Sequence, residues 1–226
     1  MTSIMIASAT RRTEQAFWEG SALGASLRRL SFDGRIRGRI AYQNQRGLPD
    51  VYNQAIEESE GSDVLLFVHD DVWLDDCFLA DRIGDAIRRY DIVGVAGNRR
   101  RQPGQTAWAF ADASLAWDDK AYLSGAVAHG PYPFGAVSHF GDVPADCELL
   151  DGVFLAANRA RIVEKGVRFD PCFAFHFYDM DFCRSARGAG LALGTWPISL
   201  THQSGGAFGS APWKKGYERY MAKWGD

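Results

Sequence analysis

The sequence predicts an α/β fold in which a mainly parallel sheet is sandwiched by helices. Short apolar runs that we expect to form strands alternate with longer segments that carry a helical pattern. The strands are expected at residues 3–7, 36–42, 64–68 and 92–96. The helices are expected between them, at residues 13–30, from residue 48 onward and at residues 79–90. Such alternation is typical of parallel strands with helices on the faces of the sheet.

Local signals in the first half of the chain support these elements in order. Residues 3–7 are apolar, and residues 36–42 alternate apolar and polar side chains, as a half-buried strand does. Pro49 and Asp50 fall in the first turn of the next helix, where both residue types are favoured. That helix carries an apolar stripe of Val51, Tyr52, Ala55 and Ile56.

The second half of the chain is less regular. Periodicity fades over residues 97–146, which are rich in glycine, proline and aromatic residues. This stretch is longer than an ordinary connection, so we expect a lid or substrate loop with short strands of its own. The regular pattern returns with a strand-like run at 148–158, a helix at 178–190, a strand at 191–196 and an amphipathic helix at 213–224.

Composition excludes several classes of protein. The 226 residues are enough for one sizeable core, and we expect a single domain. A net charge of -3 provides no basic field for nucleic acid, and no apolar run approaches the ~20 residues that span a bilayer. The four cysteines form no CxxC pair and the amino terminus carries no signal-peptide pattern. We therefore expect reduced thiols and a cytoplasmic protein, with no nucleic-acid partner and no integral membrane segment.

The first acidic cluster follows the third expected strand. The buried run 65–68 ends in His69, Asp70 and Asp71. Two carboxylates and an imidazole at a strand end are costly to desolvate without a cation, so we predict a site for Mg²⁺ or Mn²⁺ with Asp71 as its best ligand. The alternative is that these carboxylates only cap the following helix.

A second acidic cluster begins the helix expected at residues 178–190. At about 100° per residue, Asp179 falls at the edge of the apolar arc, whereas Asp181 points away from it on the side of Arg184. A partly desolvated carboxylate has a raised pKa and suits general-base work, which favours Asp179. The alternative is that both acids only stabilise the first turn of the helix.

Other candidate residues stand at the ends of expected strands. His202 lies past a strand in a glycine-rich segment and is either structural or a third metal ligand or phosphate contact. Asp151 and Gly152 interrupt an apolar run, as expected where a substrate approaches the backbone or where a β-bulge forms. Ser8 and Ala9 are small enough to let a ligand approach the backbone. We expect each of four tryptophans either to pack in the core or to stack on a sugar face: Trp108, Trp117, Trp196 and Trp213.

Taken in order, these segments resemble the GT-A-type nucleotide-sugar glycosyltransferases, and most closely their family-2-like branch. The ordered motifs lie at residues 52–56, 67–72, 93–97, 150–153, 176–181 and 201–202. The resemblance implies a Rossmann-like GT-A fold, with Asp71 as the last carboxylate of the DxD metal motif and His69 in place of its first Asp. It also implies that Asp179 is the base of the ED motif, with Tyr178 in place of the Glu.

The same resemblance implies the remaining contacts. Asp151 and Gly152 would meet the transferred sugar or the acceptor, and His202 the metal or the diphosphate. The aspartate that commonly follows the second strand has no counterpart here, and Asn44 is the candidate to replace it. The implied nucleotide-binding set is Ser8, Ala9, Asn44, Asn53 and Asp70. The implied substrate set is Asp151, Gly152, Trp108, His176 and Tyr178.

The resulting hypothesis is a metal-dependent, inverting glycosyltransferase that moves a sugar from a nucleotide-diphosphate-sugar to a saccharide or glycoconjugate acceptor. Residues 1–97 would bind the donor, and residues 98–226 would bind the acceptor and carry the catalytic base. Two alternatives are a nucleotidyltransferase and a non-catalytic saccharide-binding protein of the same fold. A homo-oligomer is compatible with the sequence.

Overall fold

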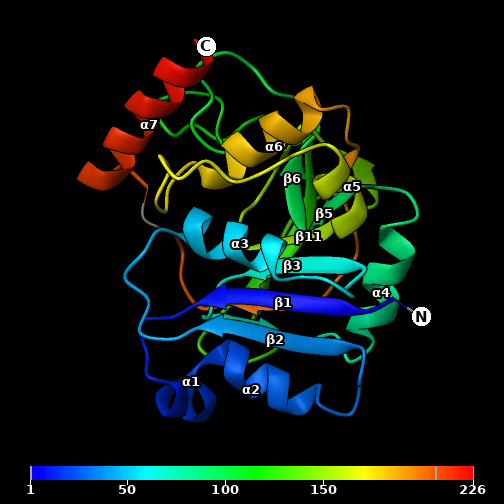
Figure 1. The fold of residues 1–226 in the computed structure, drawn as a ribbon. Helices are drawn as coiled ribbons and strands as arrows, with labels where there is room; N and C mark the ends of the chain where they lie inside the picture. Colours follow the sequence, from blue (N-terminus) through cyan, green and yellow to red (C-terminus); the bar gives the residue numbers. More distant parts are fainter. Residues whose placement is uncertain (1, 207, 226) are drawn as a thin grey trace.

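A computed structural model describes residues 2–206 and 208–225, and its largest sheet has seven strands in the order β2-β1-β3-β11-β5-β12-β9 (Figure 1). Parallel pairing joins β1 to β2 and β3, and β5 to β12, whereas β11 and β9 run antiparallel to their neighbours. The predicted mainly parallel sheet is confirmed. Its strands are β1 (Ile4–Ala9), β2 (Ile36–Ala41), β3 (Val64–Val68), β5 (Ile92–Gly94), β9 (Ala145–Asp146), β11 (Phe154–Asn158) and β12 (Leu193–Thr195).

A second sheet, mostly antiparallel, has the order β10-β6-β7-β13-β4, with β8 paired to β7. Its strands are β4 (Val72–Leu74), β6 (Ala96–Asn98), β7 (Leu123–His129), β8 (Ala136–Gly141), β10 (Leu149–Leu150) and β13 (Leu200–His202). The expected fourth strand is therefore split at Val95 between the two sheets, and the run at 148–158 is split at residues 151–153. The irregular stretch 97–146 does contain strands of its own.

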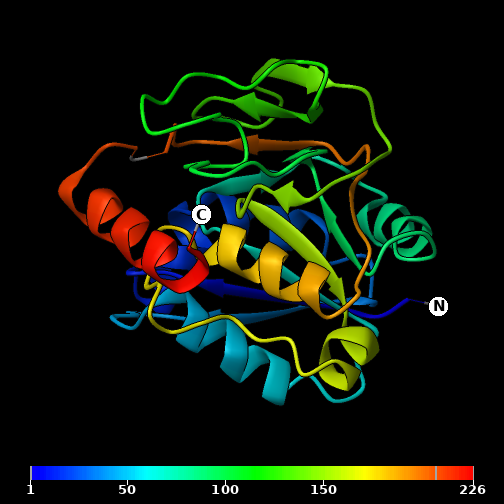
Figure 2. The same ribbon diagram turned by 90° about the horizontal axis from the view of Figure 1, so that it is seen from above.

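Some of the helices cover one face of the large sheet, and the second sheet lies against the other (Figure 2). Figure 2 shows α3, α5 and α6 together on the first of these faces. The seven helices of the described residues are α1 (Glu14–Gly20), α2 (Ala22–Arg29), α3 (Leu48–Glu57), α4 (Leu79–Ala86), α5 (Arg159–Glu164), α6 (Tyr178–Gly188) and α7 (Ala211–Trp224). No helix among residues 2–206 and 208–225 is long and apolar enough to cross a membrane.

One predicted helix is two helices in the structure. The segment expected at residues 13–30 is divided at Ser21, which ends α1 and begins α2. The Ser21 hydroxyl accepts a hydrogen bond from the Gly24 amide at 2.9 Å and donates one to the Phe17 carbonyl at 2.8 Å. Serine is favoured as an N-cap, so this side chain explains the break. The short helix α5 was not predicted at all.

The carboxyl-terminal helix α7 is anchored to α6 by a buried carboxylate. Asp181 is fully buried, and its Oδ1 accepts hydrogen bonds from Lys223 Nζ at 2.7 Å and Trp224 Nε1 at 2.9 Å. The expectation that Asp181 points away from the protein interior is wrong, because α7 covers that side of the helix. Asp181 is thus a structural residue that sets the position of α7.

Replacing this anchor should destabilise the protein. We expect Asp181→Ala to lower the free energy of unfolding by about 1–3 kcal/mol, since it removes charged hydrogen bonds from a buried position. Urea unfolding followed by circular dichroism would measure the change. The matched control is Asp85→Ala, which removes a carboxylate from an exposed ion pair on α4. An equal effect of the two substitutions would contradict the structural role of Asp181.

Candidate functional site

The strand pairing brings distant parts of the chain to one edge of the large sheet. Strand β3 ends at Val68, which pairs with Phe154 at the start of the antiparallel strand β11. The residues after β3 and the residues before β11 therefore meet at the carboxyl edge of the parallel strands. Ligands of open α/β sheets bind at this edge.

Three potential metal ligands converge there. Ligand atoms of His69, Asp71 and His202 all lie within 4.8 Å of one another. The expectation that His202 lies past a strand is wrong: it is the last residue of β13, where it pairs with Val72, next to Asp71. His202 Nε2 lies 3.3 Å from Asp71 Oδ1 and 3.0 Å from the Ser204 hydroxyl. Sheet pairing, rather than a loop, therefore fixes the third candidate ligand.

The electrostatics of these residues suit a cation. Burial alone would raise the pKa of Asp71, but the hydrogen bond and charge of His202 bring it to about 2. Burial lowers the pKa of His69, so that this imidazole is neutral at neutral pH. For His202, burial opposes the charged form, but the hydrogen bond that its imidazolium donates to Asp71, together with the charge of Asp71, outweighs burial and raises the pKa. Two imidazoles and an ionised carboxylate fit a divalent transition ion such as Mn²⁺ better than they fit Mg²⁺, which prefers oxygen ligands.

Tyr178 fixes the orientation of His69. Its hydroxyl lies 2.8 Å from His69 Nε2 and donates a hydrogen bond to the Gly152 carbonyl at 2.8 Å. Because the tyrosine has one hydroxyl proton and a carbonyl only accepts, Nε2 must carry the proton in the His69–Tyr178 bond. The lone pair of His69 is then on Nδ1, where it is available to a metal. Ligating histidines commonly have their second nitrogen held in this way.

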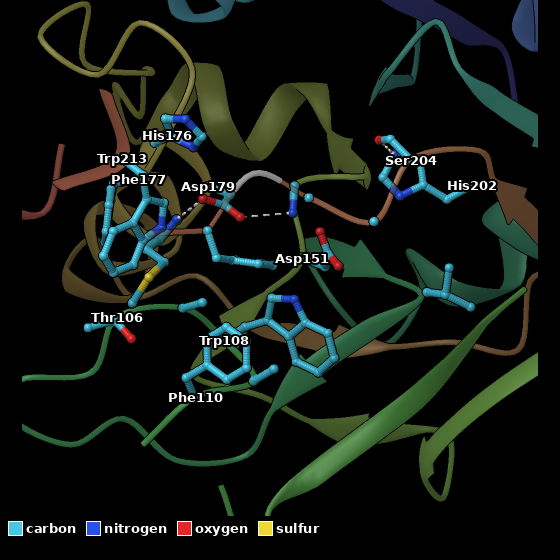
Figure 3. A pocket seen from close by; sticks show the side chains of 18 of the residues that line it. Thr106, Trp108, Phe110, Asp151, His176, Phe177, Asp179, His202, Ser204 and Trp213 are labelled. Atoms are coloured by element: carbon cyan, nitrogen blue, oxygen red, sulfur yellow. Dashed lines mark hydrogen bonds between the residues drawn. The ribbon is translucent and has the colours of Figure 1, made fainter. Parts of the chain in front are cut away.

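The same glycine also holds Asp179. The Gly152 amide donates to Asp179 Oδ2 at 3.0 Å, and the Met180 amide donates to Oδ1 at 2.9 Å (Figure 3). A Cβ atom at residue 152 would lie 2.5 Å from the Tyr178 hydroxyl and 2.9 Å from Asp179 Cβ, so only glycine fits. Burial, together with the charge of Asp151, raises the pKa of Asp179 to about 6. This carboxylate is therefore poised to take up a proton near neutral pH.

A cavity of about 300 Å³ opens in front of Asp179. Figure 3 shows Asp151 and Asp179 on one side of it, with Trp108 and Phe110 below them and Trp213 and Phe177 beside Asp179. Both His69 and His202 also line the cavity. Two candidate metal ligands, a carboxylate with a raised pKa and an aromatic surface thus line one cavity.

The predicted substrate residues all reach this cavity. Its lining includes Trp108, Asp151, Gly152, His176 and Tyr178. Asp151 Oδ1 accepts a hydrogen bond from the Val153 amide at 2.9 Å, which fixes its orientation. Of the other predicted tryptophans, Trp117 and Trp213 line the cavity, whereas Trp196 packs edge-on against Tyr90 elsewhere.

Among the predicted nucleotide-binding residues, Asp70 and Asn44 lie at the carboxyl edge of β1. Asp70 Oδ2 accepts a hydrogen bond from the Thr10 hydroxyl at 2.6 Å, and the backbone N–H of Asn44 donates to the Thr10 carbonyl at 2.8 Å. Ala9, the last residue of β1, is half-buried. None of these contacts involves a nucleotide, so nucleotide binding by Asp70, Asn44 and Ala9 stays a prediction.

Two further residues of that set are less accessible. Ser8 is fully buried on β1, and its hydroxyl has no hydrogen-bond partner among the described residues. Asn53 uses its amide oxygen and nitrogen on the backbone of Phe169, at 2.9 and 2.7 Å. A nucleotide contact by Asn53 would have to replace one of these bonds, so its role also stays a prediction.

Several contacts and lining residues of the site were not foreseen. Thr10 orients Asp70, and Ser204 contacts His202. Phe110, Phe140 and Phe208 line the cavity together with the predicted tryptophans. For the hydroxyls of Thr10 and Ser204, the only signal in the sequence was that they lie close to candidate residues. Phe110 and Phe140 lie in the stretch where periodicity fades.

Comparison with known proteins identifies the fold. No family model and no curated protein matches the sequence. Among solved structures, GalNAc-T7 with UDP, GalNAc and Mn²⁺ is similar, with a TM-score of 0.55 and 12% identity over 100% of this chain and 48% of that chain. The chain therefore spans about half the length of that protein. It has the GT-A fold of nucleotide-sugar glycosyltransferases, as the sequence resemblance implied.

Two further structures are similar at lower scores. S. aureus TarS in complex with UDP gives a TM-score of 0.47 at 11% identity, over 90% of this chain and 61% of that chain. The catalytic domain of Drosophila beta1,4-galactosyltransferase 7, in complex with xylobiose, gives 0.47 at 12% identity, over 96% of this chain and 80% of that chain.

The tyrosine that holds His69 should affect metal binding. We expect Tyr178→Phe to weaken Mn²⁺ binding by about 10- to 100-fold, because His69 loses the partner that fixes its protonated nitrogen. Electron paramagnetic resonance titration of free Mn²⁺ would measure the affinity. The control is Tyr220→Phe, at a tyrosine that is also buried but lies on α7. Unchanged Mn²⁺ affinity in Tyr178→Phe would contradict the role given to this hydroxyl.

Proposed function

We propose that this protein is a metal-dependent glycosyltransferase that uses a nucleotide-diphosphate-sugar donor and a hydroxyl acceptor. The observation that carries the proposal is the coupling of two functional groups through Gly152. The amide of this residue holds Asp179, and its carbonyl holds Tyr178 and, through it, His69. A metal-ligand set and a candidate base therefore stand at a fixed separation on one cavity, as transfer between two bound substrates requires.

The chemistry follows from this arrangement. His69, Asp71 and His202 would hold the metal, with Mn²⁺ as the first candidate. A bound divalent ion would supply positive charge to a leaving diphosphate. Asp179 would accept the proton of the acceptor hydroxyl while the hydroxyl oxygen bonds to the anomeric carbon and the bond to the diphosphate breaks. One carboxylate that acts as base, without a covalent intermediate, corresponds to an inverting reaction.

The donor and acceptor would approach from different parts of the chain. Residues 1–97 contribute the carboxyl edges of β1, β2 and β3, and they would bind the nucleotide. Residues 98–226 contribute most of the cavity lining and would bind a saccharide or glycoconjugate acceptor. UDP is the first nucleotide to test, because UDP is bound in the similar structures of GalNAc-T7 and TarS. Membership of the family-2-like branch is part of this proposal.

Donor binding can be tested by a thermal-shift screen of nucleotide diphosphates and nucleotide-sugars, with and without Mn²⁺. A ligand that binds only the folded state adds about 2.7 kcal/mol to the free energy of unfolding at a concentration of 100 times its Kd, and it therefore raises the melting temperature. We expect the shift to depend on Mn²⁺ and to be lost in Asp71→Ala. Equal shifts with and without divalent ions would contradict the metal assignment. The absence of any shift would favour a non-catalytic saccharide-binding protein.

The base can be tested by Asp179→Asn. We expect transfer to fall by about 10²- to 10⁴-fold while donor affinity is kept, because the amide accepts no proton. Product formation and isothermal titration of the donor would separate the two effects. Asp85→Asn, on the exposed surface of α4, is the matched control. Unchanged turnover in Asp179→Asn would rule out this base.

The pH dependence of the wild-type protein provides an independent test. Asp179 works as a base only when it is ionised, and its pKa is raised to about 6. The rate of transfer should therefore be constant at higher pH and fall about tenfold per pH unit below 6. A rate that stays constant down to pH 5 would contradict a base with this pKa.

A further inference from the structure

The cavity in front of Asp179 has a lining that selects for one chemical class of acceptor. We infer that the acceptor is an uncharged molecule whose hydroxyl end reaches Asp179 and whose other end is an apolar body of one or two rings, as in an aryl glycoside. This inference rests on the proposed function and concerns the acceptor side of the same cavity.

Charge is the first argument. Neither lysine nor arginine is among the described residues that line the cavity, whereas Asp151 and Asp179 both face it (Figure 3). An acceptor with a phosphate or carboxylate group would lose its hydration there without gaining a lysine or arginine partner. It would also meet the two carboxylates at the inner end of the cavity. The lining therefore selects against anionic acceptors.

A continuous aromatic surface is the second argument. We call it the aromatic wall; it consists of Trp108, Phe110, Trp117, Phe140 and Phe208. The ring centroids of successive members lie 5.0 Å apart in Trp108–Phe140, 5.8 Å in Trp117–Phe140, 5.5 Å in Phe110–Trp117 and 5.0 Å in Phe110–Phe208. The wall runs from buried residues beside Asp151 to the mouth of the cavity. A flat apolar group could lie against it along its whole length.

The exposure of the outer members of this wall is the third argument. Trp117 is 59% exposed and Phe208 is 45% exposed, although both line the cavity. Large aromatic side chains that remain together in contact with water mark a binding surface. An apolar acceptor body that extends from Asp179 toward the mouth would cover them. Burial of these rings would thus contribute directly to acceptor affinity.

Size and polarity make an extended saccharide a poor occupant. A volume of about 300 Å³ is at the lower end of the range for small-molecule pockets, about 300–1,000 Å³. Apart from Asp151, Asp179 and the imidazoles, the polar groups in the lining are the hydroxyls of Thr106, Ser138, Tyr178 and Ser204 and the indole N–H groups of its tryptophans, and no amide side chain is present among its described residues. Several sugar hydroxyls would remain without partners, at a cost in affinity. One sugar attached to an apolar group fits these limits.

The test compares phenyl and methyl glycosides of the same sugars (glucose, galactose and mannose) as ligands of the full chain, together with the corresponding sugar phosphates. Isothermal titration in the absence of donor should show at least about tenfold tighter binding of the phenyl glycosides, and weaker binding of the phosphates. Equal affinity for phenyl and methyl glycosides would overturn the inference. So would preferred binding of the phosphates, or no binding of any phenyl glycoside at millimolar concentration.

Two exposed aromatic residues provide matched variants. Trp117→Ala should weaken phenyl glycoside binding about tenfold and leave methyl glycoside binding unchanged, because it removes the outer part of the aromatic wall. Phe32→Ala, at a residue that is 69% exposed and lies outside the cavity lining, should change neither affinity. Both side chains are exposed, so both variants are expected to fold. Equal effects of the two variants would overturn the inference.

Transfer assays separate this inference from the proposed function. Tight phenyl glycoside binding without sugar transfer from any nucleotide-sugar in the presence of Mn²⁺ would support the acceptor inference and contradict the glycosyltransferase proposal. Transfer to methyl and phenyl glycosides with the same kcat/KM would support the glycosyltransferase proposal and contradict the acceptor inference. Each claim therefore fails on its own result.

Discussion

The backbone of Gly152 is the constraint on which the rest of the site depends. Its amide fixes Asp179, and its carbonyl fixes Tyr178, which in turn fixes His69. A side chain at this position would collide with both partners, so the contact exists only because residue 152 is glycine. The two sheets make this contact possible, because the chain leaves β10 in one sheet at Leu150 and enters β11 in the other at Phe154. The short crossing between them carries Asp151 and Gly152 to the edge where β3 ends.

Two departures from the motifs of the glycosyltransferases that the chain resembles are explained by one contact. His69 stands where an aspartate is usual, and Tyr178 stands where a glutamate is usual. The two side chains form a hydrogen bond, with 2.8 Å between His69 Nε2 and the Tyr178 hydroxyl oxygen. An imidazole needs its second nitrogen to be held if the first is to ligate a metal, and a tyrosine hydroxyl provides an acceptor for that proton. A glutamate at the same position would place another charge beside the ligand set. The two residues therefore act as a matched hydrogen-bonded pair.

Local sequence patterns were sufficient for the parallel part of the sheet and for the two acidic clusters. The alternation of strands and helices depends on short-range periodicity, and Asp71 and Asp179 follow directly from strand and helix ends. The patterns did not reveal that residues 92–98 and 148–158 each divide between two sheets, because a change of sheet leaves the apolar run intact. They also misplaced His202, whose position is set by pairing with Val72, far away in the sequence. Asp181 was expected to point away from the protein interior, since the pattern of α6 alone does not show that α7 covers that side.

The proton on His69 is the most direct test of the link between the candidate metal ligands and the candidate base. Long-range ¹H–¹⁵N correlation spectra of histidine-labelled, metal-free protein distinguish the two neutral tautomers of an imidazole. The structure predicts that His69 carries its proton on Nε2 and that this preference is lost in Tyr178→Phe. A proton on Nδ1 of His69 in the wild-type protein would contradict the account, because the Tyr178 hydroxyl would then no longer join Gly152 to a metal-binding nitrogen.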